Sequence, residues 1–307
     1  MLKVLTGGRP VTVRVPAKVN LHLSVGPRRA DGFHEITTIY QAVSLYDELT
    51  ASPAAKDITC RVLGEGALDL PVDTANLAVA AALRLALREG ITDGAALEIV
   101  KGIPVAGGMA GGSADAAAAL VACDALWSTG LERGELAELA AGVGSDVPFA
   151  LHGGTALGTG RGEQVSPVLA QGSFHWVFAL AERGLSTEAV YAEHDRGDPQ
   201  PVTAPDGVLA ALRAGDAVAL GRSLHNDLGA AALRLRPTLR QVLDAGLDRG
   251  ALGAVVSGSG PTCAFLVRSS SDGVALSAAL AGMGVCRAVR NAHGPVAGAR
   301  VVADRSP

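Results

Sequence analysis

The first hydrophobic pattern along the chain is an alternation of apolar and polar residues over residues 11–25 (VTVRVPAKVNLHLSV). Alternation with a period of two is typical of a half-buried β-strand. Pro16 lies inside this segment and cannot donate a hydrogen bond to a sheet ladder. The segment therefore predicts two strands, or one bent strand, with a break or an edge at residues 16–18.

Further along the chain, the patterns predict strands and helices in mixed order. Strands are expected at residues 36–45, 57–63, 97–100, 175–180, 254–256 and 262–267, with one more near the C-terminus. Helices are expected at residues 76–88, 131–141 and 236–248, near 186–193 and 206–220, at 272–282, and in the alanine-rich segment after residue 113, since alanine has the highest helix propensity. Early strands with inserted helices favour an α+β fold over a doubly wound sheet.

Length and composition indicate a large core and two domains. The chain has 307 residues, of which 49% are hydrophobic, which is enough to bury a sizeable core. A glycine-rich segment at residues 152–165 ends the first half. We therefore predict an N-terminal domain at residues 1–165 and a C-terminal domain at residues 166–307.

Charge and apolar runs exclude two classes of partner. The net charge is -4, and no basic stretch interleaves with aromatic residues, so a nucleic-acid partner is not expected. The longest strongly apolar run, residues 116–123, is too short to span a bilayer. Residues 1–15 lack the apolar core of a signal peptide and instead indicate the start of a strand. We expect a cytoplasmic protein without a membrane partner, and the oligomeric state is left open.

The four cysteines do not indicate a metal or redox site. Their positions are Cys60, Cys123, Cys263 and Cys286, and their spacing matches neither a metal-ligand motif nor a redox motif. We expect all four to be reduced and buried.

The most distinctive stretch is residues 101–127, KGIPVAGGMAGGSADAAAALVACDALW. Its glycines cluster between Gly107 and Gly112, and Ser113 starts the alanine-rich helix. Such a loop lets backbone N–H groups approach an anion closely, and the helix dipole adds partial positive charge. The stretch has neither the lysine of a P-loop nor the spacing of a dinucleotide-binding loop. A plain flexible turn between two core elements is the alternative.

Lys18 and Asp146 are the candidate catalytic residues. Lys18 is one of four lysines among 26 basic residues, so its retention could reflect a need for a compact ammonium. It is either an exposed strand lysine or a cation that activates a hydroxyl and offsets phosphoryl charge. Asp146, in GSDVPF, either caps a helix or accepts the proton of a substrate hydroxyl.

Two further segments could take part in binding. Phe33 and His34 follow the turn residues 29–32, and an aromatic ring beside a histidine can stack on and hydrogen-bond a nucleobase. Ordinary packing is the alternative there. Residues 257–261, SGSGP, form either a plain hairpin turn or a second glycine-rich loop at the phosphates.

Together these motifs resemble the GHMP kinase superfamily, which includes galactokinase, homoserine kinase and mevalonate kinase. The resemblance covers residues 14–48, 74–166, 175–192 and 251–267. It implies an α+β fold with a ribosomal-protein-S5-like N-terminal domain and a ferredoxin-like C-terminal domain. It also implies kinase activity with ATP and Mg²⁺, and it gives no metal ligands.

The resemblance further implies roles for individual residues. Lys18 and Asp146 would be catalytic. The residues that would bind ATP are Asn76, Leu77, Lys101, Pro104, Val105, Ala106, Gly107, Gly108, Met109, Ala110, Gly111, Gly112, Ser113 and Ala114. Those that would bind the second substrate are Asn20, Phe33, His34, Thr187 and Tyr191.

The order R-x-D-G-aromatic-His at residues 29–34 resembles the base-binding site of one branch of the superfamily. That branch phosphorylates the 2-hydroxyl of a cytidine diphosphate derivative of methylerythritol in the non-mevalonate isoprenoid pathway. Tyrosine is usual at the aromatic position, so Phe33 keeps the stacking face and loses a hydroxyl. The alternatives are another small-molecule kinase of the homoserine or mevalonate type, and a non-catalytic binding protein. Lys18, Asp146 and the complete glycine loop argue against the last.

Overall fold

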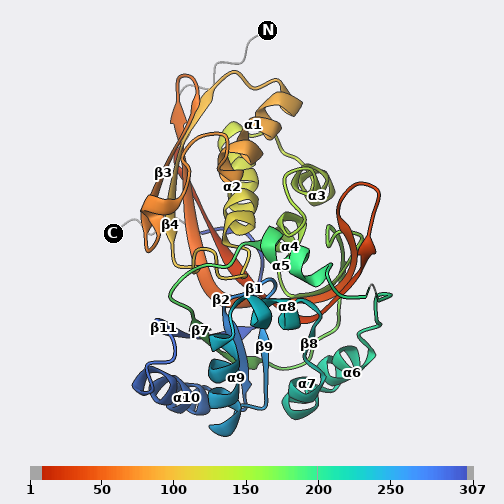
Figure 1. Ribbon diagram of the computed structural model, residues 1–307. Coiled ribbons are helices and arrows are strands. Elements are labelled where there is room, and N and C mark those ends of the chain that lie inside the picture. The colour runs from red at the N-terminus through yellow and green to blue at the C-terminus, as the bar shows by residue number, and fades with distance from the viewer. Residues whose placement is uncertain (1–8, 199, 303–307) are drawn as a thin grey trace.

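The strands of the described residues form two sheets. The computed structural model describes residues 9–198 and 200–302. The larger sheet has the order β12-β1-β2-β4-β3, with β5, β6 and β8 attached, and the smaller sheet has the order β11-β7-β10-β9 (Figure 1). The strands of the larger sheet are β1 (Val11–Arg28), β2 (His34–Ala54), β3 (Ile58–Gly64), β4 (Gly94–Lys101), β5 (Thr155–Thr159), β6 (Gln164–Pro167), β8 (His225–Asn226) and β12 (Arg300–Val301). Those of the smaller sheet are β7 (Phe174–Leu180), β9 (Gly253–Val256), β10 (Cys263–Val267) and β11 (Ala288–Gly294).

The first predicted segment is one long bent strand. β1 pairs antiparallel with β2, and the register shifts between Pro16 and Ala17. The missing N–H of proline is accommodated at this irregularity, as expected for a proline within a sheet. The predicted bend is therefore confirmed. The part of the predicted strand start that falls on residues 1–8 lies outside the described residues.

Among the first-half residues that the structure describes, from residue 9 on, there are four helices and a short 3-10 turn. They are η1 (Ala67–Asp69), α1 (Leu77–Glu89), α2 (Gly111–Trp127), α3 (Arg133–Ala141) and α4 (Val147–His152). Most of α2 is buried, including a run of four alanines at residues 116–119. A helix that is apolar on all sides belongs in a core, and its small side chains allow close packing on β1 and β2 (Figure 1).

Six helices follow in the described part of the second half. They are α5 (Thr187–His194), α6 (Asp206–Ala214), α7 (Ala217–Ser223), α8 (Leu228–Leu235), α9 (Thr238–Asp248) and α10 (Ser270–Gly282). The segment predicted near residues 206–220 is two helices, because Gly215 takes a left-handed conformation between them. No helix was predicted at α8. Helices α9 and α10 pack on the smaller sheet (Figure 1).

The second half of the chain also contributes to the first sheet. β8 pairs parallel with β1 at His22 and Leu23, and β12 pairs antiparallel with β1 at Val13 and Arg14. The division of the chain at residue 165 stays a prediction. The α+β class and the arrangement of two sheets with their helices agree with the predicted fold.

Two smaller predictions can be compared with the structure. Cys123 and Cys263 are buried, whereas Cys60 and Cys286 are only partly buried, so the expectation that all four are buried was wrong for two of them. They occupy strand and loop positions near the surface. Among the described helices, none is long and apolar enough to cross a membrane.

Candidate active site

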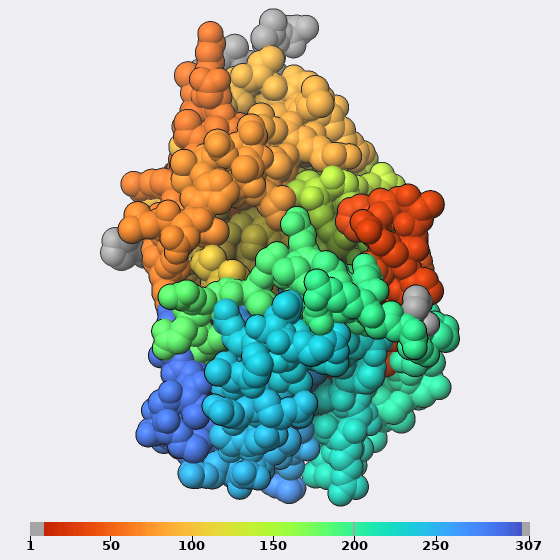
Figure 2. All heavy atoms as spheres, in the orientation of Figure 1, coloured from red at the N-terminus to blue at the C-terminus, as the bar shows by residue number. Residues whose placement is uncertain are grey.

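A pocket of about 800 Å³ lies where the glycine loop, the middle of β1 and β2, and α5 come together. Figure 2 shows this face, on which the yellow residues near the loop are recessed between orange and green parts of the surface. All but one of the candidate site residues line the pocket. They are Lys18, Asn20, Phe33, His34, Asn76, Leu77, Lys101, Pro104, Val105, Ala106, Gly107, Gly108, Met109, Ala110, Gly111, Gly112, Ser113, Asp146, Thr187 and Tyr191.

Ala114 is the candidate residue that the structure does not bring to the pocket. Its side chain is buried in the core of the first half. Its backbone N–H donates to the carbonyl of Ala110 within the first turn of α2. Neither group is therefore free to contact a nucleotide.

The glycine loop joins the end of β4 to the start of α2. Ala106, Gly108 and Ala110 all have positive φ, so the chain turns tightly and repeatedly. Ala110 is the N-cap of α2 and provides no side-chain cap. The first N–H groups of this 17-residue helix, which include those of Gly111 and Gly112, therefore lack a capping side chain. Such a helix start is a site for an anionic group, phosphate above all.

The second glycine loop, residues 257–260, packs directly on the first. The Ser257 hydroxyl donates to the carbonyl of Gly108 at 3.0 Å. A Cβ atom at Gly108 would lie 2.1 Å from the Ser257 carbonyl oxygen, so glycine is needed there. The Asn226 amide donates to the carbonyls of Val256 and Gly258, both at 2.7 Å, and holds the second loop in place.

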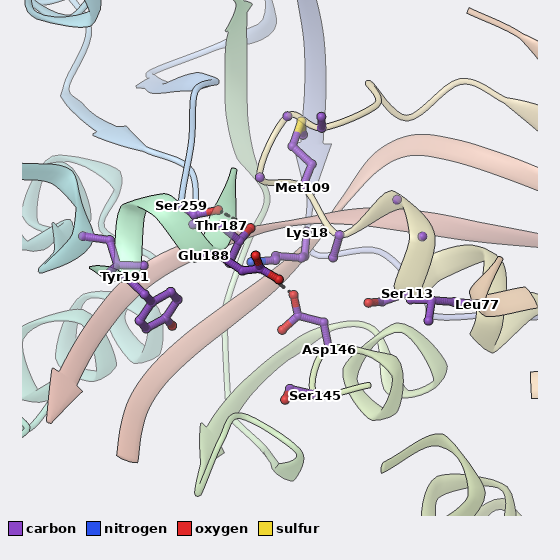
Figure 3. A pocket seen from close by; sticks show the side chains of 18 of the residues that line it. Lys18, Leu77, Met109, Ser113, Ser145, Asp146, Thr187, Glu188, Tyr191 and Ser259 are labelled. Atoms are coloured by element: carbon purple, nitrogen blue, oxygen red, sulfur yellow. Dashed lines mark hydrogen bonds and ion pairs between the residues drawn. The ribbon is translucent and has the colours of Figure 1, made fainter. Parts of the chain in front are cut away.

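Lys18 and Asp146 form the charged pair of the pocket. The Lys18 Nζ atom lies 3.6 Å from Asp146 Oδ2 and donates to Asn20 Oδ1 at 2.6 Å. The Lys18 side chain is 9% exposed, so it is not the exposed strand lysine of the alternative interpretation. Figure 3 shows the two side chains pointing toward one another, with Thr187 and Tyr191 of α5 to one side.

Asp146 uses its side chain for the pocket and not for the helix. It is the N-cap of α4 by position, with Pro148 in the first turn, but its side chain makes no capping hydrogen bond. Instead, Asp146 Oδ1 accepts from the Tyr40 hydroxyl at 2.9 Å. The other carboxylate oxygen of Asp146, Oδ2, faces Lys18.

Tyr40 is a site residue that sequence reasoning missed. It lies on β2, is 1% exposed, and stacks on Phe149 with ring centroids 4.7 Å apart. Burial and the negative charge of Asp146 raise the pKa of Tyr40 well above its usual value, so its hydroxyl stays protonated and donates. In the sequence Tyr40 sits within an apolar strand run and carries no local signal. Tyr40 pairs with Asn20 across the two strands, and this pairing would have indicated Tyr40 if the strand register had been known.

The other end of the pocket carries aromatic and imidazole groups. The Phe33 ring is 49% exposed, and the guanidinium of Arg161 lies 4.7 Å from its centroid. The rings of His34 and Tyr191 lie with their centroids 5.0 Å apart in a tilted arrangement, and the Nε2 atom of His34 lies 2.8 Å from Asp195 Oδ1. Burial raises the pKa of Tyr191 to about 12. The sequence indicated neither Arg161 nor Asp195, because each comes from a loop remote from residues 29–34.

Three more polar side chains lie on the walls of the pocket. Thr187 Oγ1 and Ser259 Oγ are 2.9 Å apart, which ties α5 to the second glycine loop. Asn76 is the N-cap of α1: its side chain accepts from Ala78 N at 2.9 Å and donates to the Pro71 carbonyl. Its amide therefore already has structural partners. Leu77, next to it, lines the same wall.

Lys101 lies at the wall of the pocket, but its side chain is almost fully buried. Its Nζ atom donates to Asp47 Oδ2 at 2.5 Å and to Asp115 Oδ2 at 2.6 Å, and its side chain is 2% exposed. The ammonium is therefore occupied by two buried carboxylates beneath the glycine loop.

Comparison with known proteins assigns the fold and the family. Family models described as "GHMP kinases N terminal domain" and "GHMP kinases C terminal" match residues 76–154 and 208–286. The chain is 58% identical over 297 residues to the 4-diphosphocytidyl-2-C-methyl-D-erythritol kinase of Nocardia farcinica (strain IFM 10152), covering 95% of this chain and 96% of that protein.

Solved structures agree. A crystal structure of 4-(cytidine 5'-diphospho)-2C-methyl-D-erythritol kinase matches with a TM-score of 0.76 at 32% identity, covering 92% of this chain and 98% of that one. The homoserine kinase of Cytophaga hutchinsonii ATCC 33406 matches with a TM-score of 0.77 at 22% identity, covering 98% of this chain and 100% of that one, which shows the fold alone. The chain therefore belongs to the 4-diphosphocytidyl-2-C-methyl-D-erythritol kinases, a family of the GHMP kinases.

Proposed function

We propose that the protein transfers the γ-phosphate of ATP to the 2-hydroxyl of 4-diphosphocytidyl-2-C-methyl-D-erythritol. The observation that carries this proposal is the position of the Lys18–Asp146 pair. It lies in one pocket with an uncapped helix start and with the aromatic and imidazole groups of Phe33, His34 and Tyr191. A phosphate donor and a cytidine-bearing acceptor could thus meet at the charged pair.

In this mechanism the two charged side chains act on the acceptor hydroxyl. Asp146 Oδ1 is held by Tyr40, so Oδ2 is the oxygen that orients the hydroxyl and takes its proton. The hydroxyl oxygen bonds to the γ-phosphorus while the bond from phosphorus to the β–γ bridging oxygen breaks, and ADP leaves. The ammonium of Lys18 offsets the negative charge on the carboxylate and on the transferring group.

Phosphate binding would fall to the two glycine loops. The amides at the start of α2 and the left-handed turns at Ala106, Gly108 and Ala110 direct backbone groups toward a phosphate chain. The second loop packs on Gly108 and closes the same side. Leu77, Pro104 and Val105 provide apolar walls for the base of ATP.

Mg²⁺ would accompany ATP. In residues 9–198 and 200–302 no three ligating side chains gather as a metal site. Mg²⁺ is commonly held by substrate phosphates and water with one or two carboxylates. An ion of that kind fits the pocket, and Glu188 is the carboxylate that would hold it, because Asp146 is committed to Tyr40 and to the acceptor hydroxyl. When bound, it neutralises charge that develops on the phosphates. The cytoplasmic location stays a prediction.

A turnover assay tests the proposal. ATP consumption with Mg²⁺ is measured with and without the cytidylated substrate, and with homoserine, mevalonate and galactose in its place. We expect turnover with the cytidylated substrate alone, and competition by CMP. Turnover with homoserine or mevalonate, unaffected by CMP, would favour another kinase of the superfamily. ATP binding with no turnover on any acceptor would favour a non-catalytic binding protein.

A further inference from the structure

Three charged side chains meet in the interior beneath the glycine loop. Asp47 comes from β2, Lys101 from the end of β4 and Asp115 from α2. The Lys101 ammonium bonds both carboxylates, and the three side chains are 0%, 2% and 5% exposed in chain order. Their positions in the sequence are far apart, so only the fold brings them together. We name these residues the buried bridge.

The buried bridge connects the two ends of the loop. Asp47 Oδ1 accepts from the backbone N–H groups of Gly102 and Ile103, at 2.7 and 2.8 Å, where the loop begins. Asp115 stands in the second turn of α2, where the loop has just ended. A continuous series of hydrogen bonds therefore runs from the entry of the loop through Asp47, Lys101 and Asp115 to its exit.

The backbone between these ends needs support. Ala106 and Ala110 have φ of 52° and 59°, which residues with a Cβ atom rarely adopt. Such conformations persist when surrounding contacts over-determine them. The middle of the loop has such contacts, because Met109 O accepts from Lys18 N and Gly108 O accepts from the Ser257 hydroxyl. The buried bridge supplies supporting contacts at the two ends of the loop.

The two carboxylates of the buried bridge differ in their hydrogen-bond partners. Asp47 accepts three hydrogen bonds, whereas Asp115 Oδ1 has no partner among the described residues. Burial raises the pKa of Asp115 to about 8, with Asp47 adding to the effect and Lys101 opposing it. Burial lowers the pKa of Lys101, but the two carboxylates outweigh it and the net shift is upward.

We propose that Asp47, Lys101 and Asp115 are positioning residues that hold the two ends of the glycine loop at the spacing needed to bind the phosphates of ATP. Lys101 acts through the loop and not by touching the nucleotide, since both of its partners are buried carboxylates. The choice of ATP as ligand rests on the proposed function. The effect on the loop itself does not.

The test compares Asp115→Ala with Asp115→Asn. Alanine removes the link between Lys101 and α2, and because misplacing a binding loop slightly is costly, we expect the Kd for ATP, measured by calorimetry, to rise about tenfold. Asparagine keeps the shape of the side chain and an acceptor for Lys101, so the Kd for ATP should stay within about threefold of the wild type. The Kd for CMP, which would bind at the other end of the pocket, should not change in either variant.

Hydrogen exchange gives a readout that does not depend on nucleotide. In the free protein, amides of residues 103–112 should exchange faster in Asp115→Ala than in the wild type and in Asp115→Asn. Leu280→Ala, which opens a cavity in α10 remote from the pocket, controls for lost stability and should leave both loop exchange and ATP affinity unchanged. If Asp115→Ala does not fold, Lys101→Gln replaces it, with the same expectations.

One outcome would contradict the inference about the buried bridge, and another would contradict the proposed function. If Asp115→Ala melts at a lower temperature but binds ATP and exchanges its loop amides like the wild type, the buried bridge is merely structural and the inference is wrong. If the wild type itself does not bind ATP, the proposed function fails. Loop exchange then still decides whether the buried bridge holds the loop.

Discussion

At residue scale, Asp146 combines a helix-start position with a side chain committed to the pocket. Its backbone begins α4, yet its two carboxylate oxygens face Tyr40 and Lys18. The sequence alone left capping and catalysis as compatible interpretations. The structure shows no capping hydrogen bond from the Asp146 side chain, so the carboxylate is available for a substrate hydroxyl.

Replacing Asp146 by asparagine should affect turnover far more than stability. The amide keeps the shape and can still accept from Tyr40, but it cannot take a proton, so kcat should fall by about 10²- to 10⁴-fold. The free energy of unfolding should change by less than about 1 kcal/mol, because no capping bond is lost. Steady-state kinetics and thermal melting measure the two effects.

A matched control for this variant is Asp216→Asn. Asp216 is an N-cap outside the pocket, and its side chain does accept from Val218 and Ala219 N–H groups. Asparagine is also a good cap, so activity and stability should both stay near wild type. Near-normal kcat in Asp146→Asn would mean that this carboxylate is not the proton acceptor.

Tyr40→Phe tests the group that holds Asp146. Phenylalanine keeps the stacking on Phe149 and removes the hydroxyl that donates to Asp146 Oδ1. We expect kcat to fall about 10- to 100-fold, with the KM for ATP unchanged, because loss of a hydrogen bond to a charged group corresponds to roughly 1.5–3 kcal/mol and about 1.4 kcal/mol is a tenfold change in rate. Tyr46→Phe, on the same strand but outside the pocket, is the control. Equal kcat in both variants would count against a role for Tyr40.

At the scale of elements, the two glycine loops depend on one another through Gly108. This residue has φ of 71° and stands against the backbone of the second loop. Neither loop could close on the other if a side chain were present there. The contact therefore joins a loop of the first half to a turn between β9 and β10.

Gly108→Ala should separate the loops. The added Cβ would meet Ser257 O at 2.1 Å and Gly260 N at 2.9 Å, and backbone atoms cannot rotate aside as a side-chain end can. A displaced loop should raise the Kd for ATP by about tenfold or more. Nucleotide titration measures this.

Gly130→Ala separates this clash from the strain of the backbone conformation. Gly130 has a similar φ of 69°, but no atom of the described residues lies within 4 Å of the position that a Cβ atom would take there. Alanine there should lower the free energy of unfolding by about 1–2 kcal/mol, the cost of the left-handed conformation, without changing ATP affinity. If both variants bound ATP equally well, contact between the loops would not matter for binding.

At the scale of the whole molecule, the two halves join where β8 pairs with β1. His22 of β1 is buried there, its ring lies 5.2 Å from that of His225, and its Nε2 atom is 3.1 Å from the Thr203 carbonyl. Burial lowers the pKa of His22 below its ordinary value of 6.5, and His225 lowers it further, against opposing effects of Thr203 and Asp227. The folded protein therefore prefers neutral His22.

Acid should weaken this junction. Because the pKa of His22 is lower in the folded than in the unfolded state, unfolding takes up a proton when the pH falls below about 6.5. The contribution of His22 to stability is thus present above that pH and is lost as the pH falls toward the folded-state pKa. Melting temperatures at pH 7.5 and 5.5 should show a decrease in the wild type.

His22→Gln should reduce that decrease, since glutamine can donate to Thr203 without titrating. His175→Gln, on β7, is the control and should keep the wild-type dependence on pH. A wild-type-sized decrease in His22→Gln would assign the acid sensitivity to other groups, such as Asp227, whose pKa is lowered mainly by its hydrogen bonds to Val25 N and Ser24 against the opposing effect of burial.

Much of this protein could be predicted from short-range sequence patterns. The bent first strand, most helices and the glycine-rich helix start depend on periodicity, propensity and turn chemistry, which act over a few residues. Two helix predictions differ from the structure: Gly215 takes a left-handed conformation and splits the helix predicted near residues 206–220, and α8 was not predicted. Motif order then placed Lys18, Asp146 and Phe33 in one expected site, and the structure brings all three to one pocket.

By itself, then, the sequence determined the class of fold, the family and the main residues of the pocket, because each depends on local pattern or on motifs with fixed spacing. Only the tertiary structure decided the partners of those residues. Tyr40 holding Asp146, Asp195 beside His34, and the occupation of Lys101 by Asp47 and Asp115 all follow from strand register and helix packing. These contacts join residues up to 161 positions apart, and no local pattern encodes which of them will meet.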